Sequence, residues 1–166
     1  GTTGESPTLL WEEHNDLIAR TCAQAKGRAL SIAGTGSNST RETLDGTSHA
    51  AHVGADAVLL VDPYYNGPSS LEIRREYVEP VAREFPQVQI IPYIIPGRTG
   101  TMLQAEDLAV LAGEYRNVSA VKEATGAATW IALTNANGVA LPGAVIVTDP
   151  NGLTAIDGRA TPKLPA

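Results

Sequence analysis

The sequence predicts an α/β fold built on a parallel sheet, and three observations support this. Four short apolar runs, rich in β-branched residues, have the length and composition of strands buried on both faces. Helical patterns separate them, and successive strand ends recur at intervals of 28, 31 and 29 residues, close to the ~30 residues of one βαβ unit. The expected strands are residues 29–34, 57–62, 88–95 and 118–123.

The segments between these strands carry the signals that start and end helices. Ser6 precedes Pro7 where the first helix is expected to begin. Gly27 and Gly54 follow the periodic stretches and predict two helix ends. A serine followed three residues later by a glutamate has the spacing of a capping box, and this occurs at Ser39 with Glu42 and at Ser69 with Glu72.

Polar, glycine-rich segments follow each expected strand. Parallel sheets of this regularity either close into an eight-stranded barrel or stay open as a doubly wound sheet, and in both the ligand binds beyond the carboxyl ends of the strands. We therefore expect the functional site at that edge. The segments are "GTGSNST", "DPYYNGP", "YIIPGRTG" and "KEATG", and "GTTGES" opens the chain.

Composition narrows the class of protein. The net charge is −6, and the 12 basic residues form no cluster beyond Arg74 and Arg75, which argues against a nucleic-acid partner. No apolar run approaches the ~20 residues of a membrane span, so no membrane partner is expected. The single Cys22 cannot form an internal disulfide and fits a reducing, cytoplasmic compartment. These properties favour a protein that binds small molecules.

The last 40 residues differ in composition from the rest of the chain. Only 4 of residues 127–166 are charged, and the alternation of helix and strand stops there. Residues 143–158, "GAVIVTDPNGLTAIDG", are typical of two short strands around an Asp-Pro-Asn-Gly turn. We therefore predict two parts, with residues 1–126 as the βα domain and residues 127–166 as a low-charge, hairpin-like tail.

Lys122 has the most distinctive position among the lysines. It lies in "VSAVKEA", where strand alternation places it on the same face as Val118 and Ala120 at the ligand edge of the sheet. Burial there would favour the uncharged amine, which is the form that attacks a carbonyl carbon. The alternative is a lysine paired with a carboxylate, such as Glu123 or Glu5.

Tyr93 and Arg98 lie at the end of the preceding expected strand. The Tyr93 phenol could reach the same cavity as Lys122 and move protons. The Arg98 guanidinium could bind a carboxylate through two parallel hydrogen bonds. The alternative is that Tyr93 is a core aromatic residue and Arg98 a surface charge.

Two glycine-rich turns, "GTTGE" and "GTGSNST", could bind an anion through backbone N–H groups. Neither has the Gly-Lys-Ser/Thr of a P-loop, and the second lacks the third glycine of a dinucleotide fingerprint. His49 and His52 have a spacing that metals can use, but no third ligand accompanies them, and exposed helix surface is the expected environment. We predict neither a metal nor a cofactor.

Taken together, five segments resemble the dihydrodipicolinate synthase family, part of the pyruvate-dependent, Schiff-base-forming lyases and aldolases; they are "GTTGESPTLLWEEH", "GTGSNST", "DPYYNGPSS", "YIIPGRTG" and "VKEATG". The resemblance covers about residues 1–126. It implies a (β/α)₈ TIM-barrel type of fold, here a partial barrel of about four βα units plus a β-rich C-terminal tail. It also implies a homo-oligomer, because family members usually assemble as dimers of tight dimers.

The resemblance implies roles for the residues of these segments. Lys122 would form the Schiff base with pyruvate, and Tyr93 would be the proton donor and acceptor beside it. Thr3 and Tyr65 would complete a proton relay, with Tyr65 supplied across a dimer interface. Thr2 would help to position the pyruvate carboxylate together with Thr3.

Arg98 corresponds to the arginine that, in the synthase branch of the family, binds the carboxylate of the second substrate, aspartate semialdehyde. Aldolase branches tend to lack it, so the resemblance favours the synthase reaction of lysine and diaminopimelate biosynthesis. Both substrates are small carboxylates.

Three departures separate the chain from this family. The chain begins at the loop that should follow the second barrel strand, Ile94 stands where Asn or Asp is usual, and residues 127–166 do not match the last βα units. Four strands and a hairpin cannot close an eight-stranded barrel alone. An alternative hypothesis is therefore a non-catalytic fragment or fusion that self-assembles through exposed sheet edges and the tail.

Overall fold

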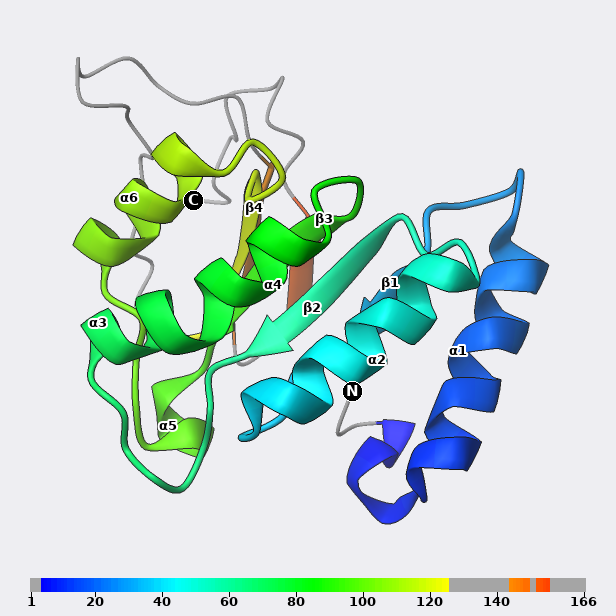
Figure 1. The fold of residues 1–166 in the computed structure, drawn as a ribbon, viewed down its shortest axis with the longest axis horizontal. Helices are drawn as coiled ribbons and strands as arrows, with labels where there is room; N and C mark the ends of the chain where they lie inside the picture. Colours follow the sequence, from blue (N-terminus) through cyan, green and yellow to red (C-terminus); the bar gives the residue numbers. More distant parts are fainter. Residues whose placement is uncertain (1–3, 126–143, 150–151, 156–166) are drawn as a thin grey trace.

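The computed structural model describes residues 4–125, 144–149 and 152–155, which form one twisted sheet with helices packed against one of its faces (Figure 1). The sheet order is β1-β2-β3-β4-β5-β6. Neighbouring strands are parallel from β1 to β5, and β6 is antiparallel to β5. The strands are β1 (Ile32–Gly34), β2 (Ala57–Val61), β3 (Gln89–Ile94), β4 (Ala120–Glu123), β5 (Ala144–Asp149) and β6 (Gly152–Ala155).

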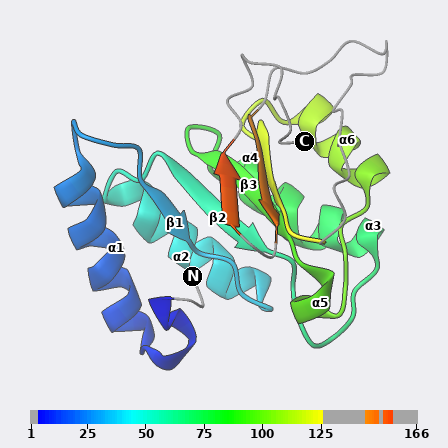
Figure 2. The ribbon, with the colours of Figure 1, turned by 180° about the vertical axis from the view of Figure 1, so that it is seen from behind.

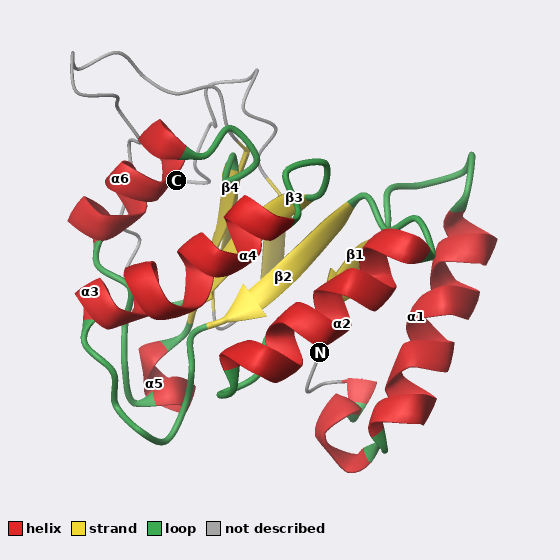
Figure 3. Cartoon of the chain, in the orientation of Figure 1, coloured by secondary structure: helices red, strands yellow, loops and turns green. Residues whose placement is uncertain are grey.

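Helices connect β1 to β2, β2 to β3 and β3 to β4, and α2, α4 and α6 lie on the same side of the sheet, as the view from behind makes clear (Figure 2). This repeat of parallel strands joined by helices is the arrangement that barrel folds use. The helical segments are η2 (Ser6–Thr8), α1 (Trp11–Ala25), α2 (Thr40–His52), α3 (Ser70–Glu72), η3 (Ile73–Val78), α4 (Glu79–Glu84), α5 (Pro96–Thr99) and α6 (Ala105–Glu114), shown in red in Figure 3.

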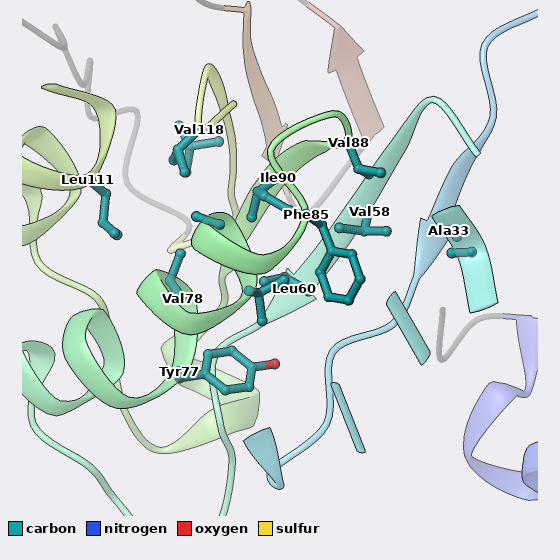
Figure 4. Close-up of a cluster of buried hydrophobic side chains, with 14 of the residues drawn as sticks. Ala33, Val58, Leu60, Tyr77, Val78, Phe85, Val88, Ile90, Leu111 and Val118 are labelled. Carbon is teal, nitrogen blue, oxygen red and sulfur yellow. The ribbon is translucent and has the colours of Figure 1, made fainter. Parts of the chain in front are cut away.

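The core lies between the sheet and these helices (Figure 4). Val58, Leu60 and Ile90 project from the strands toward Tyr77 and Phe85 of the helical layer, and all five are buried. Because strand side chains alternate, the residues between them face the other side of the sheet. That side carries the partly buried residues of β3 and β4 at which we expect chemistry.

The predicted parallel strands are confirmed with shorter bounds: β1 and β4 begin later than expected, β2 ends one residue earlier, and β3 is one residue shorter at each end. The largest difference is at residues 29–34, where the strand begins only at Ile32. The Ser31 N–H donates to Asp56 Oδ2 at 2.7 Å, and the Ala29 N–H donates to Ala25 O at 2.9 Å. These amides are used at the end of α1 and in a side-chain contact, so they do not pair in the sheet.

The helix signals were confirmed in part. Gly27 and Gly54 have positive φ angles of 74° and 84°, as expected for helix ends. The Ser6 prediction is wrong: residues 6–8 form a short 3₁₀ turn, and α1 begins at Trp11, where the preceding Leu10 N–H donates to Glu13 Oε2 at 2.9 Å. The aliphatic Leu10 therefore occupies the position at which we expected a hydroxyl cap.

The two capping boxes behave differently. At α3 both contacts form, because Glu72 N donates to Ser69 Oγ at 3.3 Å and Ser69 N donates to Glu72 Oε2 at 2.8 Å. At α2, Ser39 Oγ accepts from Glu42 N at 3.4 Å, but the Glu42 carboxylate accepts from the Ser37 hydroxyl at 2.5 Å instead. That serine belongs to the β1–α2 turn.

A π-helical turn, η3, joins α3 to α4, so one helix runs over the sheet with its hydrogen-bond pattern shifted in the middle. Tyr77 lies in this turn and is 2% exposed. Its hydroxyl donates to Val61 O at 2.9 Å, beside the carboxyl end of β2.

Gly36 lies where the β1–α2 turn approaches the end of β2 and Tyr77. A Cβ atom at this position would lie 2.5 Å from Val61 N and 3.0 Å from Leu60 Cα, and neither backbone atom can move freely. We expect Gly36→Ala to lower the free energy of unfolding by about 3 kcal/mol, measured by urea denaturation. Gly113→Ala is the matched control, because Gly113 lies in α6 with open space around it and the change there should raise stability by about 1 kcal/mol. Equal effects of the two substitutions would contradict the close approach.

The C-terminal segment contributes two strands to the same sheet. β5 pairs in parallel with β4, and β6 returns antiparallel to β5, with Asp149 opposite Gly152. The two strands expected in residues 143–158 are therefore present, and β5 occupies the edge of β4. The division of the chain at residues 126 and 127 stays a prediction. Among the helices that the structure describes, none is long and apolar enough to cross a membrane.

Candidate active site at the carboxyl edge of the sheet

Tyr93 and Lys122 are neighbours at the carboxyl ends of β3 and β4. They are paired in the register of these strands, and Lys122 Nζ lies 3.8 Å from the centroid of the Tyr93 ring. Both side chains are half-buried and lie on the face of the sheet away from the helices. A cation at this distance from a ring face is attracted by its quadrupole, so the pair is held together.

Strand alternation explains why Lys122 faces away from the helices. Val121 and Glu123, on either side of it, are buried at 0% and 2% exposure against the helical layer. Glu123 is therefore on the opposite face from Lys122, which does not favour the alternative of an ion pair between these two neighbours. Val118 was expected on the face of Lys122; instead it lies before β4 begins and packs in the core.

Arg98 lies on the single-turn helix α5, which follows directly after β3. Pro96 at its first position and Gly100 at its end, with a φ angle of 72°, fix this turn. Arg98 is exposed. The segment that carries it, residues 95–104, is called the Arg98 segment below.

Tyr65 lies in the loop between β2 and α3, residues 62–69, called the Tyr65 loop below. It is 91% exposed, and its φ angle of 79° is unusual for a residue other than glycine. Its N–H donates to Thr99 O at 3.3 Å, which fixes the backbone of the loop beside α5 (Figure 1). The structure therefore brings Tyr65 next to the Arg98 segment, with its side chain open to the surroundings.

Thr2 and Thr3 lie outside the described residues, so their predicted roles stay predictions. Ile94, which replaces a polar residue of the family pattern, is 2% exposed and packs in the core.

The "GTGSNST" turn uses its amides within the protein. Thr35 N and Gly36 N both donate to Leu59 O, at 3.2 and 3.3 Å, and Ser37 N donates to Thr43 Oγ1 at 3.1 Å. These amides are not available to an anion, so the anion-binding interpretation is wrong for this part of the turn. Its role is to fix the start of α2 against β2.

The predicted environment of His49 is also wrong. Its Nε2 lies 2.9 Å from Asn15 O, so the half-buried ring connects α2 to α1. His52 is exposed, as expected.

Asp62 is a residue of this edge to which the sequence pattern assigned no role. It directly follows β2 and is 1% exposed. Its Oδ2 accepts from Leu103 N at 3.0 Å. Burial raises the pKa of its carboxyl from 3.8 to about 7, against the opposing effect of this hydrogen bond. An acidic residue at the end of a buried strand is the only sequence signal that could have identified it.

Parallel βα units with a lysine against a phenol at the carboxyl edge place this chain in the class of (β/α)-barrel proteins, as a partial barrel. Comparison with known proteins identifies the family within that class. The chain belongs to the dihydrodipicolinate synthetase family, whose family model matches residues 1–141.

Curated members of this family are similar in sequence to most of this chain. The chain is 48% identical over 126 residues to 4-hydroxy-tetrahydrodipicolinate synthase of Thermosynechococcus vestitus, and 51% identical over 126 residues to that of Geotalea daltonii. In both cases the match covers 76% of this chain and 42% of the relative. The chain therefore spans about two fifths of the length of the curated relatives that it matches.

Solved structures agree with this assignment. Dihydrodipicolinate synthase from Aquifex aeolicus superposes with a TM-score of 0.81 at 40% identity, covering 90% of this chain and 50% of that one. A variant described as the first monomeric dihydrodipicolinate synthase superposes with a TM-score of 0.72 at 37% identity, covering 76% of this chain and 42% of that one.

Proposed function

We propose that the chain acts as a 4-hydroxy-tetrahydrodipicolinate synthase, a lyase that joins pyruvate to aspartate semialdehyde through a lysine Schiff base. The observation that carries this proposal is the contact between the Lys122 amine and the Tyr93 ring at the carboxyl edge of the sheet. Schiff-base chemistry uses an amine to form the imine and an acid–base group nearby to move protons, and Lys122 and Tyr93 would supply these two groups.

In the proposed reaction, the uncharged Lys122 amine attacks the ketone carbon of pyruvate. The new C–N bond forms, water leaves, and a protonated imine remains on Lys122. The imine withdraws electrons from the pyruvate methyl group, which loses a proton and becomes an enamine carbon. That carbon attacks the aldehyde, and a C–C bond and a hydroxyl group form. The amino group of the former semialdehyde then attacks the imine carbon, and the bond to Lys122 breaks to release the free amine. Tyr93 would donate and accept the protons of these steps.

Arg98 would bind the carboxylate of the aldehyde substrate. Its guanidinium is exposed on α5, immediately beyond β3, so it lies at the same edge of the sheet as Lys122. A forked donor of this kind suits a planar carboxylate. Thr2 and Thr3 would contribute hydroxyl groups to the pyruvate side of the site.

Tyr65 would act in a second copy of the protein. Its 91% exposure leaves the phenol open to a partner, and its strained, hydrogen-bonded backbone holds it in a fixed position. We therefore propose a homo-oligomer in which Tyr65 extends the proton relay of the neighbouring site, in a cytoplasmic enzyme of lysine biosynthesis. The alternative of a self-assembling, non-catalytic protein is less favoured, because β5 already occupies the edge of β4.

The test of this proposal is trapping with borohydride. Incubation with pyruvate and reduction should give a pyruvate-derived adduct on Lys122, located by peptide mapping, with the adduct absent in Lys122→Ala. Lys26, at the end of α1, serves as an internal control in the same digest because it is a lysine at a helix end rather than in the sheet. Equal modification of Lys26 and Lys122, or no adduct in a folded sample, would refute the proposal.

A further inference from the structure

Asp62 is the first residue of the Tyr65 loop and is buried against the Arg98 segment. One carboxylate oxygen accepts the Leu103 N–H at 3.0 Å, and the other, Oδ1, has no hydrogen-bond partner within the part of the chain that the structure describes. Leu103 is itself 1% exposed. Without Asp62 its N–H would therefore be left buried and unpaired.

A carboxyl group is a costly choice for this contact. An amide oxygen or a hydroxyl could accept the same hydrogen bond without placing an ionisable group in the interior. The choice of a carboxyl therefore needs an explanation beyond the stability of the fold, and its position at the junction of the two functional segments suggests one.

Four contacts join the Tyr65 loop and the start of α3 to the Arg98 segment. Besides the Asp62 contact, the Tyr65 N–H donates to Thr99 O, the Thr101 hydroxyl donates to Pro68 O, and the Gln104 N–H donates to Ser70 Oγ at 2.8 Å. Of these four contacts, the one made by Asp62 lies next to the sheet, because the Asp62 N–H also donates to Tyr93 O of β3 at 3.1 Å. Asp62 thus contacts the strand that carries Tyr93 and the segment that carries Arg98.

We propose that Asp62 is a positioning residue for the second substrate: its bond to Leu103 holds α5 and Arg98 against the Tyr65 loop. This inference rests on the proposed function, in which Arg98 binds the aldehyde carboxylate. The Asp62 side chain bonds to Leu103, and its bond to Tyr93 O comes from the backbone N–H, which every substitution here retains. Pyruvate capture at Lys122 is therefore expected to survive the loss of the side chain. Asp62 therefore governs the aldehyde half of the reaction.

Three variants test this. Asp62→Ala removes the acceptor, Asp62→Asn retains an oxygen that can accept from Leu103, and Asp56→Asn is the matched control. Asp56 lies at the other end of β2, where its carboxylate accepts from Ser31 N and Ser31 Oγ. The Asp56→Asn substitution makes the same chemical change as Asp62→Asn, but far from the carboxyl edge of the sheet.

For Asp62→Ala we expect the KM for aspartate semialdehyde to rise about tenfold, because one positioning hydrogen bond is lost. Borohydride trapping of pyruvate should stay within about twofold of the parent protein. Asp62→Asn should recover most of this loss, and Asp56→Asn should show none. A loss of trapping in Asp62→Ala that parallels the rise in KM would overturn the positioning role, as would an unchanged KM.

Hydrogen exchange provides a measurement that does not depend on turnover. In Asp62→Ala, the amides of residues 98–104 should exchange faster than in the parent and in Asp62→Asn, with Asp56→Asn unchanged. If the parent protein fails to trap pyruvate, the proposed function is wrong. Faster exchange in Asp62→Ala that is confined to residues 98–104 would still support the contact made by Asp62. Unchanged exchange in Asp62→Ala would overturn the inference even in an active enzyme.

Discussion

Replacing Tyr93 with phenylalanine is expected to lower kcat for the condensation by about 10²- to 10⁴-fold, the range of a lost general acid–base group. Phenylalanine keeps the ring against which Lys122 Nζ lies at 3.8 Å, so the position of the amine is preserved and only the hydroxyl is removed. The measurement is steady-state turnover of pyruvate and aspartate semialdehyde, with borohydride trapping used to confirm that Lys122 still binds pyruvate.

Tyr115→Phe is the matched control for this experiment. The Tyr115 hydroxyl lies 3.4 Å from Arg83 at the end of α6, on the helical side of the protein. Its removal should leave kcat unchanged. If both variants lose the same activity, or if Tyr93→Phe retains full kcat, then Tyr93 does not move protons in the reaction.

The ionisation of Asp62 is expected to make the protein less stable as the pH rises. Burial raises the pKa of its carboxyl to about 7 in the folded protein, whereas the unfolded chain has the ordinary value of 3.8. The folded state therefore binds the extra proton between these values. Its stabilising effect is complete below about pH 4 and is lost as the pH rises through about 7.

The full effect is on the order of 4 kcal/mol, of which about 3 kcal/mol falls between pH 5 and pH 8. Urea denaturation of the parent and of Asp62→Asn at several pH values should show this change as a difference between the two curves. The pKa of Tyr77 is raised mainly by its own burial and in smaller part by the charge of Asp62, so Tyr77 stays uncharged throughout this range.

Asp56→Asn again provides the comparison. Hydrogen bonds from Ser31 lower the pKa of the Asp56 carboxyl, so its contribution has the opposite sign and is lost only as the pH falls below its ordinary range. Its difference curve should be flat from pH 5 to pH 8. A flat curve for Asp62→Asn as well would mean that Asp62 is solvated in solution.

The meeting of Lys122 and Tyr93 could be predicted from the sequence because both depend on regular geometry. Each residue ends an apolar strand, the strands are one βα unit apart, and parallel strands place such ends side by side. Alternation also fixed the face of Lys122, since Val121 and Glu123 must face the helices. The same rule failed at Val118, which lies before the strand begins and so does not follow its period.

The contact of Asp62 could not be predicted in this way. Its partner, Leu103, is 41 residues away and donates from a segment without regular structure, where no periodicity limits the geometry. The "GTGSNST" turn shows the same limit, because its composition fits an anion site while its amides donate to Leu59 and Thr43. Glycine content indicates that a turn is tight, and the neighbours of the turn decide what its amides bind.

The π-helical turn at residues 73–78 has a consequence for insertions and deletions. A π turn holds one residue more than an α turn, so the helix faces before and after it differ by about 100°. Before it, Ser70 Oγ donates to Asp107 and accepts from Gln104 N; after it, Val81 and Ala82 pack in the core. If one residue were deleted here, the helix could keep either the contacts made before the turn or those made after it, but not both. The number of residues in this helix is therefore as important for its packing as the identity of its side chains.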